Sequence, residues 1–447
     1  MTIDERRTAA ALETALGRRS FMAAVAAVTA GAAVPATAYA APTPVPTGSR
    51  RGRPGEILQP GRGPIAGDTY LPSRPDEVLW GYVPTVHASP VATVRSGRTI
   101  TIDAVSHEGI LEDQGRDPVA YFAGHGVPRA RVLADATEIA ASYDRTKRNF
   151  DVDGPHVVTG PVAVAGAEPG DVLKIETVDL RARVPYGVVS SRHGKGALAR
   201  TASGGAPAGI TLAEVMPPVA TDGRASGEPT KYGNVSVFTR VEGDTGVMTS
   251  GRRDVRFPLN PFFGMMGVAF SGASGLTDPS ANSIPPTLGG GNIDIRLLGK
   301  GSTFYLPVKA PGALFYVGDP HMAMGDGEVS LTAMEGSLRG TFRLTVCKPG
   351  SGDAPSVAYR YPFGETKDAW IPIGLSDPDG SVDGQSSDLN VAMRRAVVNA
   401  LDFLQHDQGI DRAVAYAYLS AAANFVVSQV VDRTTGVHGV VRKADFR

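Results

Sequence analysis

The sequence predicts a mostly β protein of the α+β class that ends in a pair of helices. Short β-type runs separated by turn residues begin near Val78 and continue to Cys347. The 54 glycines and 34 prolines favour many short strands over long helices. Helical periodicity comes late, in two segments that follow Asp388. Strands followed by helices in this way are typical of an α+β protein.

The composition is that of a large globular protein without a strong electrostatic field. The 447 residues exceed the roughly 250–300 at which a single core stops growing, so we expect two lobes or one elaborated domain. Hydrophobic residues make up 42% and charged residues 20%, which are ordinary values for a globular protein. Because the net charge is −1, nothing steers nucleic acid or an anionic membrane toward the protein. Neither is expected as a partner.

Residues 1–40 have the pattern of an export signal. Arg18-Arg19 precedes an alanine-rich apolar stretch that runs to about Val34, and Ala38-Tyr39-Ala40 matches a small-x-small cleavage site. Paired arginines before a short apolar region indicate the twin-arginine route. The stretch is shorter than the ~20 apolar residues that a spanning helix needs. We therefore expect export to the periplasm or medium, with a chance arginine pair before a tail as the alternative.

Residues 41–75 are rich in Pro, Gly and Arg and are expected to be a linker, so the folded region covers residues 76–447. We divide it into an N-terminal β part, a loop or insertion, a central β part with the site and a C-terminal helical segment, over residues 78–190, 191–230, 231–350 and 351–447. In the first part, residues 90–94 and 99–105 are expected to pair as a hairpin through Ser96-Gly97.

The central part is expected to hold most of the remaining strands. They are predicted at residues 293–297, 303–308, 313–317 and 328–332 and in the run that ends at Cys347. Cys347 is the sole cysteine, which excludes an intramolecular disulfide and a thiolate zinc cluster. Its place in an alternating strand favours a small buried hydrophobe over a catalytic thiolate.

Two late segments carry helical signals. Asp388 can cap a first helix that ends at Gly409, and Asp411 can cap a second. The predicted apolar positions are Leu389, Met393, Val397, Leu401 and Leu404 in the first helix, and Val414, Tyr418, Ala421 and Phe425 in the second.

Common catalytic motifs of hydrolases are absent. The sequence has no G-x-S-x-G elbow, and Ser271-Gly272-Ala273-Ser274-Gly275 has no lysine nearby, which favours a flexible loop. An H-E-x-x-H motif is missing, because His107-Glu108 is followed by Gly109-Ile110-Leu111. What remains is a divalent ion held by dispersed histidines and carboxylates.

The densest group of such residues lies between two expected strands. Asp319, His321, Asp326 and Glu328 fall within ten residues. Alternate residues of a strand share a face, so Asp319 and His321 can point into one pocket. Asp326-Gly327 is expected to form a tight turn that directs Glu328. Imidazole and carboxylate suit zinc or a similar ion. A polar hairpin whose Asp and Gly serve only the turn is the alternative.

Two further histidines lie beside acids. His107 follows the strand expected over residues 99–105, and a plain surface loop would carry the same residues. His156 stands in a turn ahead of the strand that begins near Val162, where a structural role is the alternative.

Several stretches of the sequence resemble the acetamidase/formamidase family. They are GPHVVTGP (154–161), GAEPGDVL (166–173), NPFFGMMGVA (260–269), GGNID (290–294), GSTFYLPV (301–308), PGALF (311–315), GDPH (318–321), GDGE (325–328), SQVV (428–431) and GVH (436–438). The resemblance extends from about Leu79 to Phe446. It implies jelly-roll-like sandwich and β-barrel parts, a homo-oligomer (dimer or higher), and hydrolysis of formamide- or acetamide-like amides to carboxylate and ammonia. Residues 106–114 and 192–226 look like features of a subfamily.

With this resemblance, the candidate residues receive roles. We expect His107, His156, Asp319 and His321 to be ligands of a divalent ion, Zn²⁺ in the first place with Ca²⁺ as an additional candidate. Glu328 is the expected general base and acid, with Asp326 beside it as a second catalytic candidate. Asn292 and Asp294 are candidates for orienting the amide.

Two other functions compete with amide hydrolysis. One is an extracytoplasmic β-sandwich that binds a small ligand without catalysis; an aromatic content of 7% with only Trp80 and Trp370 argues against a sugar-binding face. The other is a hydrolase of the same fold that cleaves a different C–N bond.

Overall fold

The computed structural model describes residues 57–150, 152–192, 195–201, 204–216, 234–379 and 387–446. The predicted export signal, residues 41–56 of the expected linker and residues 217–230 of the expected loop lie outside the described residues. The linker prediction was wrong for residues 69–71. They form a strand that pairs with residues 100–102, and Leu58 before them is buried.

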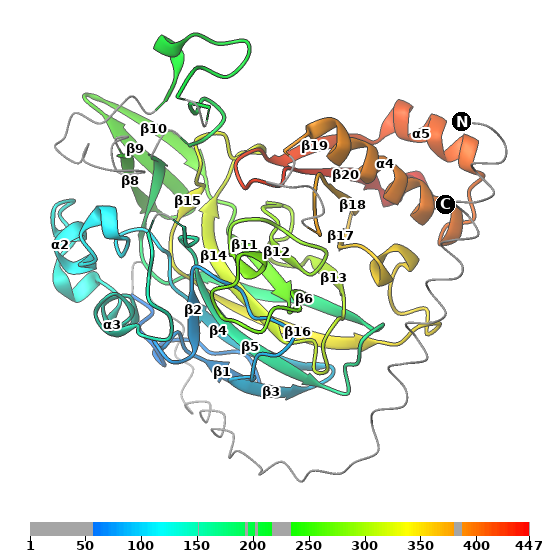
Figure 1. The fold of residues 1–447 in the computed structure, drawn as a ribbon, viewed down its shortest axis with the longest axis horizontal. Helices are drawn as coiled ribbons and strands as arrows, with labels where there is room; N and C mark the ends of the chain where they lie inside the picture. The colour runs from blue at the N-terminus through cyan, green and yellow to red at the C-terminus, as the bar shows by residue number, and fades with distance from the viewer. Residues whose placement is uncertain are drawn as a thin grey trace. The chain divides into compact units, whose positions relative to one another are not determined.

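The strands of the described part form two large sheets (Figure 1). The nine-stranded sheet has the order β1 (Thr69–Leu71), β4 (Arg98–Ala104), β16 (Leu338–Cys347), β6 (Val172–Ala182), β13 (Thr303–Pro307), β17 (Phe363–Glu365), β18 (Ala369–Leu375), β20 (Gly436–Arg442) and β19 (Asn424–Gln429).

The second sheet has eleven strands. Its main path is β10 (Arg253–Pro258), β9 (Thr245–Ser250), β8 (Asn234–Glu242), β7 (Tyr186–Arg192), β15 (Met334–Glu335), β14 (Phe315–Ala323), β11 (Phe262–Val268) and β12 (Gly290–Asn292), with β5 (Val157–Ala165) joining β14 to β2 (Val78–Trp80) and β3 (Ala92–Arg95). These pairings confirm a mostly β protein. They close no barrel among the described strands, so the barrel part of the prediction is not supported.

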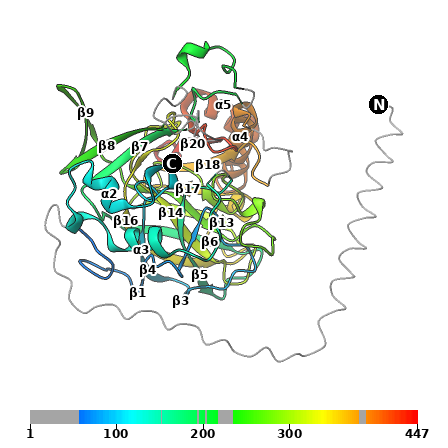
Figure 2. The same cartoon turned by 60° about the vertical axis from the view of Figure 1, so that its left-hand side comes forward.

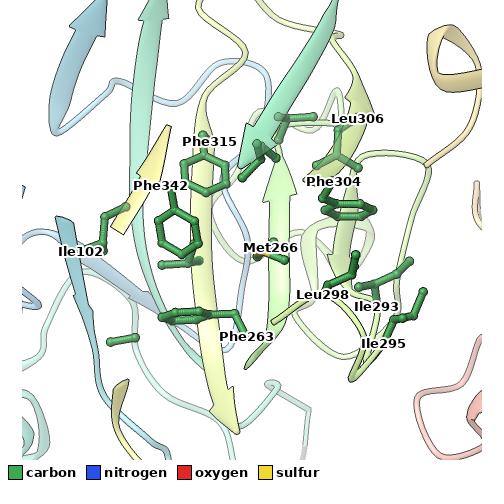
Figure 3. Packing of buried hydrophobic residues seen from close by; sticks show 14 of the residues in the cluster. Ile102, Phe263, Met266, Ile293, Ile295, Leu298, Phe304, Leu306, Phe315 and Phe342 are labelled. Atoms are coloured by element: carbon green, nitrogen blue, oxygen red, sulfur yellow. The ribbon is translucent and has the colours of Figure 1, made fainter. Parts of the chain in front are cut away.

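The sheets pack against each other through aromatic side chains (Figure 3). Phe342 of β16 lies with its ring centroid 5.4 Å from that of Phe263 on β11 and 5.6 Å from that of Phe315 on β14. All three are fully buried, and edge-to-face packing of this kind adds to the gain from burying apolar area. The core between the sheets therefore fixes β11 and β14, two strands next to the site.

The hairpin predicted over residues 90–105 was wrong. A turn at Ser96-Gly97 does connect β3 to β4, but β3 pairs in parallel with β5, whereas β4 pairs with β16 and β1. β16 offers partners to every residue of β4, which is more pairing than the short β3 could supply. The turn therefore passes the chain from one sheet to the other.

The described α-helices are α2 (Pro118–Ala123), α3 (Ala134–Ser142), α4 (Leu389–His406) and α5 (Arg412–Ala422). The predicted C-terminal pair is confirmed with its caps, because Asp388 accepts from Asn390 N and Asp411 from Ala413 N. α4 and α5 lie well apart from α2 and α3 in both views (Figures 1 and 2). Residues 351–447 also supply β17 to β20, so this segment is not only helical. None of the described helices has the length and apolar character of a membrane span.

The apolar face predicted for α4 was partly wrong. Ala392 and Ala396 are buried, whereas Leu389 and Met393 are exposed. A Cβ at Gly374 of β18 would lie 2.1 Å from Ala392 O and 2.3 Å from Ala396 N. The helix therefore approaches the sheet through small residues, which the spacing of large apolar residues does not reveal.

Candidate metal centre and active site

Strand β14 carries the first two candidate ligands. Asp319 Oδ2 lies 2.9 Å from His321 Nε2, and both side chains are buried. The prediction that these alternate residues meet is confirmed. The strand predicted over residues 328–332 was wrong, because these residues form no strand. Glu328 has φ +47° and Leu331 φ +109°, left-handed conformations that interrupt an extended strand.

Two histidines from distant parts of the chain face Asp319. His107 follows β4 and His156 precedes β5, and their ring centroids lie 5.5 Å apart. Asp319 Oδ1 is 3.6 Å from His107 Nδ1 and 3.7 Å from His156 Nε2. One ligand atom from each of the three residues lies within 4.8 Å of the others. They form one group that could hold an ion.

His321 belongs to two neighbouring groups. The first joins it to Asp294 and Glu328, and the second to Asp319 and Glu335. His321 Nδ1 is 3.8 Å from Asp294 Oδ1, and Nε2 is 3.1 Å from Glu335 Oε1 and 3.9 Å from Glu328 Oε1. We call His107, His156, Asp294, Asp319, His321, Glu328 and Glu335 together the imidazole–carboxylate cluster. Asp319 is shared between groups, with one oxygen toward each side.

The backbone makes room for this cluster. A Cβ at Gly264 of β11 would lie 2.5 Å from Asp294 Oδ1 and 2.7 Å from Asp319 Oδ2, so only glycine leaves space there. Asp294 and Asp319 have φ of +48° and +50°. Non-glycine residues held in this region cost about 1–3 kcal/mol each and concentrate at functional sites.

Polar groups stand beside the two outer histidines, and one of them forms a hydrogen bond. His156 Nδ1 lies 2.9 Å from Ser283 Oγ; with Nδ1–H donating, Nε2 keeps its lone pair toward Asp319. Burial lowers the pKa of His156 to about 4, which keeps the ring neutral at pH 7, as an ion ligand requires. Glu108 Oε1 stands 3.5 Å from His107 Nε2, on the opposite side of the ring from Asp319.

The pKa values of the acids in the cluster shift in opposite directions. Burial opposes the ionisation of Asp319, but the neighbouring imidazoles of His321 and His156 outweigh it and hold its pKa below the usual range. Burial raises the pKa of Glu328 well above its usual value, and the charge of Asp294 raises it further. Burial, with the nearby Asp432 adding to it, likewise raises the pKa of Asp294. Pairs of acids with divergent pKa values are typical of acid–base sites.

Buried atoms without partners gather in this cluster. Within the described part of the chain, buried atoms that lack a hydrogen-bond partner include His107 Nδ1 and Nε2, Asp294 Oδ1 and Oδ2, Asp319 Oδ1, His321 Nδ1 and Nε2, and Glu335 Oε2. Leaving a buried polar group unsatisfied costs about 1–3 kcal/mol. Imidazole nitrogens and carboxylate oxygens are the donors that Zn²⁺ and related ions take. The residues present therefore fit a divalent ion.

The cluster forms the floor of a cavity of about 610 Å³. His107, His156, Asp319, Glu328 and Glu335 all line it. Asn292, at the end of β12, lines the cavity as well, and its Oδ1 lacks a partner among the described residues.

The structure does not bring Asp326 to the site. Its carboxylate pairs with Arg296, with Oδ2 2.7 Å from Nη2, at the partly exposed surface, and it does not line the cavity. The catalytic role predicted for Asp326 is therefore not supported, because its neighbour Gly327 bridges to Gln429 instead of completing a hairpin.

Sequence reasoning missed Glu335 and Asp432. Glu335 lies opposite His321 in the register of β15 with β14. Asp432 lines the cavity from the turn between β19 and β20, next to Asp294. Neither belongs to the histidine-containing groups that the sequence singled out. Only the pairing of distant segments brings them to the site.

The fold and the cluster together define a mostly β protein with a buried centre suited to a divalent ion. A model of the Acetamidase/Formamidase family matches residues 140–274 and 265–441, so the chain belongs to this family of amidohydrolases. The predicted resemblance is confirmed.

Individual relatives are distant. A putative formamidase of Schizosaccharomyces pombe is 29% identical over 46% of this chain and 55% of its own length. A formamidase of Methylophilus methylotrophus is 27% identical over 58% of this chain and 69% of its own. The chain thus spans only about half of the first relative. In fold, the chain is similar to an acetamidase of Bacillus halodurans, with a TM-score of 0.58 and 22% identity over 84% of this chain and 98% of that one. It is also similar to an acetamidase of Yersinia enterocolitica, with a TM-score of 0.59 and 21% identity over 86% of this chain and 96% of that one.

Proposed function

We propose that the protein hydrolyses the C–N bond of a short aliphatic amide to a carboxylate and ammonia. One observation carries the proposal: ligand atoms of His107, His156 and Asp319 converge within 4.8 Å on the floor of a large cavity. Both ring nitrogens of His107 and Oδ1 of Asp319 are buried without a hydrogen-bond partner among the described residues. Membership of a family named for acetamide and formamide supports the choice of bond.

His107, His156 and Asp319 would hold the ion, for which we propose Zn²⁺. Three protein ligands would leave one coordination position for water or substrate, as in catalytic zinc sites. Such an ion lowers the pKa of a bound water from ~15.7 to ~7 and polarises a carbonyl oxygen. The neighbouring group of Asp294, His321 and Glu328 offers more carboxylate ligands than the first group. We propose that a second ion, such as Ca²⁺, binds there if the protein holds two ions.

Glu328 is the proposed general base. Its carboxyl group lines the cavity, and burial with the charge of Asp294 raises its pKa above the usual value. Proton transfer by a positioned carboxyl group is a common part of hydrolysis. Glu328 would take the proton from the attacking water and pass it to the leaving nitrogen. Asn292 Oδ1, which lacks a partner among the described residues, is proposed to accept from the amide N–H and orient the substrate.

The test is ammonia release from formamide, acetamide and propionamide, before and after dialysis against a chelator. We expect removal of the ion to abolish release and added Zn²⁺ to restore it. Glu328→Gln should lower kcat by about 10²–10⁴-fold while the Zn²⁺ content stays the same. The matched control is Glu242→Gln, an exposed residue of β8 that pairs with Arg256. Full turnover by ion-free protein would overturn the proposal, and a panel of ureas and carbamates tests for a different C–N bond.

Export and assembly are further proposals, supported by the sequence pattern and the family resemblance. Residues 1–40 are proposed to direct export by the twin-arginine route, and the mature chain is proposed to form a homo-oligomer. Replacing Arg18 and Arg19 by lysine should retain the protein in the cytoplasm on cell fractionation. Sedimentation of the purified protein measures its assembly.

A further inference from the structure

The cavity is far larger than a one- or two-carbon amide requires. Acetamide has four heavy atoms, whereas cavities of about 300–1,000 Å³ accommodate ligands of drug size. The cavity here holds about 610 Å³ above the imidazole–carboxylate cluster. Substantial space therefore remains for the part of a substrate that points away from the reacting bond.

The chemistry of the lining changes from floor to mouth. The buried acids Asp319, Glu328 and Glu335 belong to the floor. The basic residues that line the cavity are Arg148, Lys195, Arg200 and Arg433. Lys195 and Arg433 are exposed, which places them toward the mouth. The two exposed basic residues are the ones that an anion entering the cavity could meet.

Arg148 already has partners. Its guanidinium lies 3.2 Å from Glu112 Oε1 and donates to Gly154 O at 3.0 Å. It also lies 4.6 Å from the centre of the Trp80 ring. The nearby acid Asp153 accepts from Tyr82 Oη at 2.6 Å. This wall of the cavity is therefore internally satisfied.

Arg433 differs from Arg148. Its side chain makes no hydrogen bond or ion pair with the described residues, although it lines the same cavity and lies within the field of the neighbouring Asp432. Its backbone has φ +66°, a conformation that arginine rarely adopts. Partial burial lowers its pKa, which indicates that its charge is incompletely hydrated.

The turn that carries Arg433 is held in place. Gln429, fully buried, donates from Nε2 to Thr434 O at 2.7 Å and accepts at Oε1 from Val431 N at 2.9 Å. Thr434 Oγ1 donates to Asp377 O at 3.2 Å. Because both sides of Arg433 are fixed, the backbone that carries its side chain has little freedom left to lose on binding.

We infer that the substrate is an amide with a carboxylate at its other end, and that Arg433 binds this carboxylate. A guanidinium matches a carboxylate in geometry and charge. The apolar side chains of Ile284, Val430 and Val431 line the same cavity and can contact a short methylene chain. This inference rests on the proposed amidase function and narrows its substrate class to ω-carboxy amides.

The test compares substrates that differ only in the distal charge. Succinamate carries a carboxylate where succinamide carries a second amide of nearly the same shape, and glutaramate extends the chain by one methylene. We expect the ion-replete protein to have a higher kcat/KM for one of the ω-carboxy amides than for succinamide, counted per amide group. Arg433→Met should lower this ratio by about 10- to 100-fold, the range for a hydrogen-bonded charge pair.

Arg433→Glu should shift the preference toward the cationic 3-aminopropanamide. Arg256→Met, on the exposed strand β10, is the matched control and should keep the wild-type ratio. An unchanged ratio in Arg433→Met, with all substrates slowed together, would show a merely structural role and overturn the inference.

Binding of succinate, measured by titration calorimetry, separates this inference from the proposed function. Arg433-dependent binding of succinate supports the anion site even if no amide is cleaved, in which case the proposed function fails alone. The opposite result has three parts: the protein hydrolyses propionamide, it does not prefer succinamate or glutaramate, and Arg433→Met binds succinate as the wild type does. This result would support the amidase function and overturn the anion site.

Discussion

Two buried polar clusters lie at opposite ends of the same short stretch of chain. Asp103, near the end of β4, has both oxygens engaged: Oδ1 accepts from Arg339 Nε at 2.6 Å, and Oδ2 from Arg339 Nη2 at 2.9 Å and Tyr70 Oη at 2.7 Å. His107, just beyond β4, has two ring nitrogens without a hydrogen-bond partner among the described residues. Both residues are buried, so burial does not distinguish them.

Charge balance does distinguish the two clusters. In the first, Asp103 and Asp135 face Arg339 and Arg183, with Arg183 Nη1 2.8 Å from Asp135 Oδ2. In the imidazole–carboxylate cluster, no acid forms an ion pair with Lys or Arg of the described chain, and imidazoles alone offset the acids. In the first cluster, arginines of the chain neutralise the buried acids, so this cluster supports the fold. The second cluster has no such cation, and an added metal ion would supply the missing positive charge.

The largest effect expected from this comparison is on stability. Arg339→Met leaves Asp103 buried without its main partner and should lower the free energy of unfolding by about 3–5 kcal/mol, because an uncompensated buried charge remains. Ion content should stay that of the wild type. Denaturant unfolding and elemental analysis measure the two quantities.

The matched control for this change is Arg343→Met on the same strand. Arg343 pairs with Glu176 at 3.6 Å and is nearly half exposed, so its loss should cost no more than about 1 kcal/mol. Loss of the ion from Arg339→Met at unchanged stability would contradict the division between the two clusters.

A smaller effect is expected from the groups that orient the ligands. Ser283→Ala removes the hydrogen bond to His156 Nδ1 and should weaken ion affinity by about 10- to 100-fold, since the ring is no longer held in one tautomer and orientation. Competition with a chromophoric chelator measures this affinity. Ser280→Ala, whose hydroxyl bonds to Asp278 at 2.6 Å and does not line the cavity, is the control and should bind the ion as the wild type does. Equal affinity in Ser283→Ala would show that Ser283 does not position His156.

The smallest effect is expected at Asp326. Asp326→Asn breaks a partly exposed ion pair with Arg296 and should change stability by less than about 1 kcal/mol. Turnover should remain within roughly twofold of the wild type, because the carboxylate lies outside the cavity. Steady-state ammonia release checks this, and a 100-fold loss would return Asp326 to the mechanism.

The helices show how far local patterns reach. Asp388 and Asp411 were predicted as caps, and both accept backbone N–H groups of their own first turns. Capping acts over three residues, so the sequence contains it completely. The buried face of α4 was predicted less well. The helix approaches Gly374 so closely that alanine fits at the contact and leucine does not.

The candidate site shows the same difference between what local patterns predict and what distant contacts decide. His107, His156, Asp319, His321 and Glu328 were all found from the sequence as histidines and acids among turn residues, and the structure brings all five to one cluster. Asp326 was included because it lies close in sequence, and Glu335 was left out because its partner His321 faces it only across a strand pair.

The sequence by itself determined the β-rich class, the two late helices with their caps, and the residue types that can hold an ion. Each of these depends on interactions within a few residues. The tertiary structure alone decided which sheet received β3 and β4, which acids reached the cluster, and that Arg433 lines the cavity above it. These outcomes depend on strand pairing and packing between segments that lie up to hundreds of residues apart, where the energy of one contact depends on all the others.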